Sequence, residues 1–176
     1  MTKLYRPALI VSIVLLVIAG VFAGIFGVMW ATASGPDADV ARAREEVAST
    51  GAAAVATLTS LNYQNVDAVY QGFLDVSTGA VHDDYVKNQE DFKKRIRDSK
   101  VVTTSSVRET AVQDVNLQKK EATILVVVDT KVTETGAQNP DPNPVKRLRI
   151  EAALDQTDDG WKVKGLRQVP YSATGQ

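Results

Sequence analysis

The chain of 176 residues contains no cysteine and only one histidine. The lack of cysteine excludes disulfide bonds, thiol nucleophiles and cysteine-based metal sites, so packing alone must stabilise a folded domain. A single histidine does not favour a metal site, because such a site usually needs three or four convergent ligands. The formal net charge is −1. Because there is no excess of basic residues, nucleic acid is not expected as a partner.

Catalytic motifs are also missing. The sequence has neither the G-x-S-x-G turn of a serine hydrolase nor a glycine-rich phosphate loop. His82 lies close to Asp83, Asp84 and Glu90, which leaves two interpretations. The four residues form an acid/base or metal site, or they are polar residues at the start of a helix. An active site needs several convergent groups, so we expect the second case: no enzyme, no cofactor and no metal.

One long apolar run, residues 8–33, contains no charged residue. About 20 apolar residues suffice to cross a bilayer as a helix, so this run predicts a transmembrane segment. Lys3 and Arg6 precede it, whereas the first charge after it is Asp37. Basic residues favour the cytoplasmic side, so we expect a cytoplasmic N-terminus and an extracytoplasmic remainder. Trp30 would lie at the outer interface of this single-pass inner (plasma) membrane protein.

A cleaved signal peptide is the competing interpretation, because small residues at 31–33 resemble a cleavage site. The apolar run exceeds the roughly 7–15 residues typical of a signal core, which favours an uncleaved anchor.

Four small residues of the apolar run recur at helical spacing: Gly20, Ala23, Gly24 and Gly27. A small-xxx-small pair allows another helix to approach closely, so these residues form a candidate helix-contact face. The alternative is that glycine is simply common in membrane helices.

The residues after the apolar run favour helices in their first half and strands in their second half. Residues 37–61 predict an amphipathic helix that leads into the domain, in which Gly51 is expected to weaken or bend the middle. A turn of helix follows over 66–74. A charged helix is expected over 83–98. Its expected buried side consists of Tyr85, Val86, Phe92 and Ile96.

The second half favours strands. Four β-branched or alternating segments cover 101–116, 122–135, 145–154 and 161–169. Gly165 predicts a bulge, and Asp158-Asp159-Gly160 predicts a tight turn. Helices followed by an antiparallel meander indicate an α+β domain with helices packed on one face of a sheet. The expected organisation is a tail at 1–7, an anchor at 8–33, the helix at 37–61, the exported domain at 62–171 and a tail at 172–176.

Five aromatic residues gather in the helical half: Tyr63, Tyr70, Phe73, Tyr85 and Phe92. They either line a pocket between helices and sheet or simply form the core. Pockets are few per protein, so core is the more frequent outcome.

Three short segments carry a resemblance that extends over nearly all of the chain beyond the anchor. They are Tyr63-Gln-Asn-Val-Asp67 with Thr78-Gly79, the valine-rich strand that ends in Val128-Asp129, and Gly160-Trp161-Lys-Val163. In these segments the chain resembles the Mce-associated membrane proteins of actinobacteria, including the Mam and Luc accessory proteins. None of the three segments is catalytic.

The resemblance implies a cone-shaped α+β domain similar to the nuclear-transport-factor fold and the assembly domains of type IV secretion. It also implies a non-enzymatic accessory subunit that stabilises an Mce-type lipid or fatty-acid importer. Its partners would be the permease in the membrane, the Mce tube proteins outside and membrane lipid. The loop at 136–144 is a candidate contact surface. A lipid-binding carrier and a scaffold in a secretion-type assembly remain alternatives.

Overall fold

The computed structural model describes residues 19–25, 27, 36–134 and 144–170. The chain divides into two compact units, Met1–Arg42 and Ala43–Gln176. In the first unit, residues 19–25 and 27 are helical. Within the described residues, no helix is both long enough and apolar enough to cross a membrane. Most of the expected anchor at 8–33 lies outside the described residues.

The second unit has an α+β architecture, as the sequence predicts. Its helical elements are α2 (Pro36–Leu58, which begins in the first unit), a 3-10 turn η1 (Tyr63–Asn65), α3 (Val66–Val76), α4 (Gly79–Lys87) and α5 (Gln89–Ser99). Its strands are β1 (Leu61–Asn62), β2 (Val101–Asn116), β3 (Glu121–Glu134), β4 (Val145–Thr157) and β5 (Gly160–Gln168). The strands form one antiparallel sheet in the order β1-β2-β3-β4-β5.

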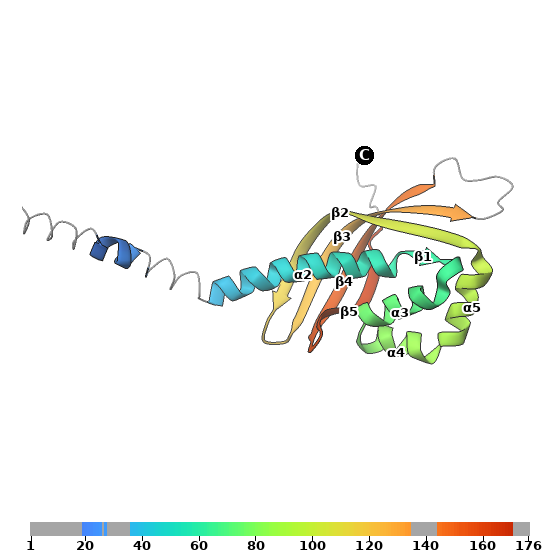
Figure 1. Cartoon of the computed structure of the whole chain (residues 1–176), viewed down its shortest axis with the longest axis horizontal. Helices are drawn as coiled ribbons and strands as arrows, with labels where there is room; N and C mark the ends of the chain where they lie inside the picture. The colour runs from blue at the N-terminus through green and yellow to red at the C-terminus, as the bar shows by residue number, and fades with distance from the viewer. Residues whose placement is uncertain (1–18, 26, 28–35, 135–143, 171–176) are drawn as a thin grey trace, which may run out of the picture. The chain divides into compact units, whose positions relative to one another are not determined.

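Helix α2 runs along one face of this sheet, and α3, α4 and α5 gather beyond its C-terminal end (Figure 1). Alternate residues of the two central strands point toward α2 and are buried: Ala122, Ile124, Val126 and Val128 of β3, with Ile150, Ala152 and Leu154 of β4. Val47, Val55 and Leu58 complete this core from the helix side. The period-two alternation that predicted β4 is therefore confirmed, because every second side chain of a strand faces the same layer.

Helix α2 continues without interruption through Gly51. Gly51 is buried where α2 crosses the sheet, and a Cβ at this position would come 2.4 Å from Ile124 Cδ1 and 3.2 Å from Leu154 Cδ2. The missing side chain lets the helix lie close to β3 and β4. The sequence pattern alone does not distinguish a close approach from a weak point in a helix.

Two expectations about the helices were wrong. The charged segment at 83–98 is not one helix, because Asn88 (φ −108°, ψ 26°) separates α4 from α5. Val86 is 51% exposed rather than buried, because its neighbour Tyr85 faces the core and adjacent residues point about 100° apart on a helix. The two-residue strand β1, which pairs with Val102 and Thr103, was not anticipated.

The turn predicted at residues 158–160 and the bulge predicted at Gly165 agree with the structure. The β4–β5 connection is a two-residue turn at Asp158 and Asp159, with Gly160 at φ 101°, a conformation that glycine adopts without strain. The β4–β5 register shifts next to Gly165: Ala153 pairs with Gly165, whereas the next residue, Leu154, pairs with Val163. The expected loop at 136–144 lies outside the described residues except for Pro144.

Candidate functional site

The aromatic residues of the helical half pack against one another. The ring centroid of Phe92 lies 5.1 Å from that of Tyr85, 5.5 Å from Phe73 and 6.2 Å from Tyr70, all with tilted planes. Tyr70 and Phe73 are buried, and burial raises the pKa of the Tyr85 hydroxyl. Separations and tilts of this kind are typical of stabilising aromatic pairs. Four of the five aromatic residues therefore join α3, α4 and α5 into one cluster.

The fifth aromatic residue, Tyr63, lies in η1 and is half-buried. Its hydroxyl accepts a hydrogen bond of 3.3 Å from Gln64 Nε2. The packing of the other four rings against one another favours the core interpretation for these residues.

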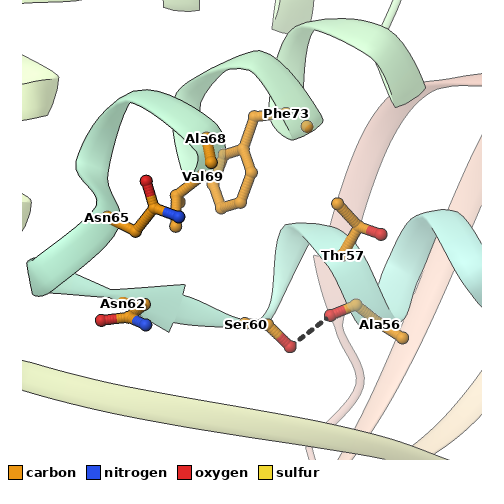
Figure 2. Close-up of a pocket in the computed structure, with 9 residues that line it drawn as sticks. Ala56, Thr57, Ser60, Asn62, Asn65, Ala68, Val69 and Phe73 are labelled. Carbon is orange, nitrogen blue, oxygen red and sulfur yellow. Dashed lines mark hydrogen bonds between the residues drawn. The ribbon is translucent and has the colours of Figure 1, made fainter.

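A groove of about 410 Å³ opens between the end of α2, β1 and α3. Figure 2 shows Thr57 and Ser60 on one side and Asn65, Val69 and Phe73 on the other. The aromatic cluster contributes Phe73 to its lining. The Ser60 hydroxyl donates to the carbonyl of Ala56 at 2.7 Å. The groove is open to solvent, and most of its lining is apolar, with a few polar side chains.

The surroundings of His82 bear on whether it belongs to an acid/base or metal site. It lies in the first turns of α4, with Nδ1 3.8 Å from a carboxylate oxygen of the exposed Asp83. Across the described residues, no three or more histidine, aspartate or glutamate side chains are placed to hold a metal ion. In this part of the chain His82 therefore belongs to no cluster that resembles a metal site.

Several ion pairs lie on the sheet face that points away from α2, which we call the outer face. It carries the side chains of β3 and β4 that alternate with the core positions, and the neighbouring ones of β2 and β5. Asp129 of β3 is buried there between two arginines. Arg108 Nε lies 2.7 Å from its Oδ2, and Arg147 Nε lies 2.7 Å from its Oδ1. These hydrogen bonds, from Arg147 first and Arg108 second, lower the pKa of Asp129 to about 2.

This arrangement was missed from the sequence. Arg147 lies opposite Asp129 in the β3–β4 register, which an alternation pattern can suggest once both strands are paired. Arg108 reaches it from a bulge, since the β2 register shifts between Val107 and Glu109. Unlike the bulge beside Gly165, this one has no glycine in the sequence to mark it.

Two shallow depressions of about 380 and 370 Å³ lie on the outer face and share Glu109 and Val127. Arg147 and Arg149 line one, and Ala111 and Leu125 line the other. At the opposite end of the strands, Lys164 Nζ lies 2.6 Å from Glu121 Oε1 and 2.7 Å from Asp155 Oδ1. Lys164 thereby lowers the pKa of Glu121.

The predicted membrane residues are only partly described. Lys3, Arg6 and Trp30 lie outside the described residues. Gly20, Ala23, Gly24 and Gly27 lie in helical residues 19–25 and 27 and are exposed. The contact face formed by these small residues stays a prediction.

The fold of the domain is shared with several proteins of known structure. The domain is similar to the solved periplasmic domain of DotI, with a TM-score of 0.55 and 10% identity over 70% of this chain and 93% of that one. It is also similar to CagV, a VirB8 homologue of the type IV secretion system from Helicobacter pylori strain 26695. That comparison gives a TM-score of 0.53 and 12% identity over 73% of this chain and 99% of that one.

An IcmL-like type IV secretion system protein from Legionella pneumophila gives a TM-score of 0.52. It is 13% identical over 76% of this chain and 96% of that one. At such low identity these similarities show the fold alone: an α+β domain with a curved antiparallel sheet, as in these solved structures.

The sequence family is narrower than the fold. Residues 7–170 match the family described as "Uncharacterized protein Rv1363c/MT1408-like", and the chain belongs to this family. A curated relative, the protein Rv1363c of Mycobacterium tuberculosis (strain ATCC 25618 / H37Rv), is 28% identical over 116 residues. That alignment covers 66% of this chain but only 42% of the relative.

Proposed function

We propose that this protein is a non-enzymatic scaffold subunit, anchored in the inner membrane by residues 8–33, whose exported domain helps assemble a multiprotein complex of the cell envelope. The main support is the similarity of the folded domain to periplasmic domains of type IV secretion proteins, which it matches over 93–99% of their length.

Affinity purification of the tagged chain from native membranes in mild detergent tests this proposal. A scaffold subunit should bring down a reproducible set of envelope proteins at fixed ratios. A chain recovered alone under conditions that preserve a known membrane complex from the same preparation would contradict the scaffold role.

Association with an Mce-type lipid importer is the second candidate. It is favoured by the three segments through which the chain resembles Mce-associated proteins, and a mycobacterial relative is consistent with it. The same purification separates the two candidates. Permease and Mce tube subunits among the recovered proteins favour the importer, whereas a set without them favours another assembly. Replacing Gly20 and Gly24 with isoleucine should weaken recovery of a membrane-embedded partner if the small-residue face is a helix contact.

A lipid carrier is the alternative that the groove beside α3 would support. Ala68 is exposed at the rim of that groove, so Ala68→Trp would fill it without disturbing the core. Native mass spectrometry should detect lipid on the wild-type protein and not on this variant if the groove carries lipid. The scaffold proposal expects no lipid in the groove of either protein.

A further inference from the structure

Strand β2 lies near one edge of the sheet, and most of its free side is uncovered. Of its 16 residues, only Val102 and Thr103 pair with β1. The Ser105 N–H is also satisfied, because it donates to Ser60 Oγ at 3.2 Å. Among the described residues, no strand pairs with the free side of 106–116. A free edge of this length presents a row of backbone donors and acceptors that can pair with another strand.

Two bulges interrupt β2 and give it a symmetric pattern of exposure. The register with β3 shifts twice, at Arg108 and at Gln113. At each shift two successive residues are exposed, Arg108-Glu109 and Gln113-Asp114. These two pairs lie at equal distances on either side of Ala111, which is also exposed. Outward from Ala111 in either direction, the strand has one half-buried residue, two exposed residues and then one half-buried residue.

The half-buried residues of this pattern face the core. Each of them pairs with a buried residue of β3, and they are Val107, Thr110, Val112 and Val115. They are only half-buried because, among the described residues, no strand extends the sheet beyond them. A strand added at this edge would therefore continue the core as well as the hydrogen-bonded ladder.

A second copy of β2, turned by 180° about Ala111, matches this pattern position by position. Val107 then lies opposite Val115 of the other copy on the core side. Arg108 lies opposite Asp114 of the other copy on the outer face. Exposed residues thus meet exposed residues, and half-buried residues meet half-buried residues, as antiparallel pairing requires.

The charges along this edge are compatible with that pairing. Residues 106–116 include three charged side chains, Arg108, Glu109 and Asp114. Arg108 contacts Asp129 through Nε, and 60% of its side chain stays exposed. Glu109 would lie opposite the uncharged Gln113, so no like charges are directly opposed. Residues 106–116 carry a net charge of −1 in each copy, so the arginine–aspartate pairs act on register more than on affinity.

We propose that two copies of this chain associate by antiparallel pairing of their β2 edges, centred on Ala111, so that two five-stranded sheets form one continuous sheet. Bulges and charges on an edge strand hinder pairing with an ordinary strand, which has no matching irregularity. A second copy carries the same two bulges at the opposed positions. A twofold interface uses the same patch on both copies and so requires this kind of self-complementarity. The purified chain alone suffices to test this pairing, so the result does not depend on the proposed function.

The position on the twofold axis gives a direct test, because the chain has no cysteine to interfere. Directly opposed Cα atoms of antiparallel strands lie about 4.5–5.5 Å apart, a distance that a disulfide can span. Ala111→Cys, in the full-length chain in mild detergent, should therefore form a disulfide-linked dimer on mild oxidation. Thr104→Cys, exposed on the same face of β2, is the matched control and should stay monomeric, because its two copies would lie roughly 40 Å apart. Equal yields at the two positions, or no covalent dimer for Ala111→Cys, would overturn the proposal.

Two further variants test the register. In this pairing Glu109→Cys and Gln113→Cys lie opposite each other, whereas each is about 13 Å along the strands from its own counterpart. Either variant alone should give little covalent dimer. The two variants co-expressed with different tags should give a disulfide-linked heterodimer. A heterodimer yield no higher than the dimer yield of either variant alone would contradict this register.

A substitution at the centre tests the non-covalent dimer. Ala111→Lys places two ammonium groups opposite each other and should convert the dimer to a monomer by light scattering. Gln71→Lys, the same change of charge at an exposed position of α3, should leave the dimer intact. Circular dichroism confirms that both variants are folded. A wild-type chain that is monomeric at every concentration tested, or an equal effect of the two variants, would overturn the proposal.

Discussion

Gly51 of α2 lies directly over Ile124 of β3. A Cβ at Gly51 would come 2.4 Å from the Ile124 Cδ1, and Ile124 is completely buried, so its side chain can make room only by moving among other core residues. The same Cβ would also come 3.2 Å from Cδ2 of Leu154 in β4. The contact between α2 and the two central strands therefore depends on the absence of a side chain at one position of the helix.

Gly51→Ala is expected to destabilise the domain although alanine is the better helix former. Overpacking a core costs roughly 1–3 kcal/mol, whereas replacing glycine within a helix gains up to about 1 kcal/mol. The net loss should be about 1 kcal/mol in the free energy of unfolding, measured by denaturant titration of the full chain. Thr50→Ala, a change at the exposed neighbouring position of the same helix, is the control and should be neutral or slightly stabilising, because alanine is also the better helix former there. An increase in stability for Gly51→Ala equal to that of the control would show that α2 does not depend on this close approach.

The contrast between Gly51 and β4 indicates what a sequence can predict here. The alternation of Leu148, Ile150, Ala152 and Leu154 is a local pattern, and the structure places all four side chains on the helix side. The role of Gly51 depends on Ile124, which is distant in the sequence and meets it only after folding. Local patterns therefore predicted the α+β class and most strands, whereas the close contacts between elements were not predictable.

Two further features were not predicted from local patterns in the sequence. The break at Asn88 was missed because the charged segment has no proline or glycine to mark it. The arginines that surround Asp129 were missed because one of them reaches it from a bulge. Which charged side chains meet on the outer face, such as Glu151 and Arg167, depends on the register of the strands and not on a local pattern.

Asp129 should make stability depend on pH in the acid range. Its pKa falls from an ordinary value of 3.8 to about 2 in the folded chain, chiefly through hydrogen bonds from Arg147 and Arg108. A carboxyl group with a lowered pKa stabilises the folded state above its unfolded pKa. That stabilisation is lost as the pH falls from about 4 toward 2. Asp129→Asn should therefore lower the thermal midpoint at pH 6, and the gap between variant and wild type should narrow at pH 2.5.

Asp75→Asn, a change at an exposed position of α3, serves as the control for that experiment. Its midpoint should follow that of the wild type at both pH values. A gap between Asp129→Asn and wild type that is equally wide at pH 6 and pH 2.5 would mean that the substitution acts through packing and not through the charge of the carboxylate.

Phe92 should be the most sensitive position of the aromatic cluster, since its ring contacts those of Tyr70, Phe73 and Tyr85. Phe92→Ala removes all three contacts and leaves a cavity between α3 and α5. Large-to-small changes of this kind cost about 3 kcal/mol. Phe92→Leu should lose less than half as much, because most of the volume remains. Val86→Ala, exposed on α4, should change the unfolding free energy by less than about 0.5 kcal/mol. A loss for Phe92→Ala as small as that of Val86→Ala would show that the three helices are held together without this ring.

Membrane orientation follows from the charges that flank residues 8–33 and is open to a direct test. Lys3 and Arg6 precede the apolar run, so the N-terminus is expected in the cytoplasm and the domain outside. The absence of cysteine allows single introduced cysteines to be labelled in intact cells with a membrane-impermeant maleimide. Lys119→Cys, exposed in the β2–β3 turn, should be labelled in intact cells, whereas Lys3→Cys should react only after the membrane is opened. Labelling of both positions in intact cells, or release of the Lys119→Cys chain into the medium, would contradict a single uncleaved anchor with this orientation.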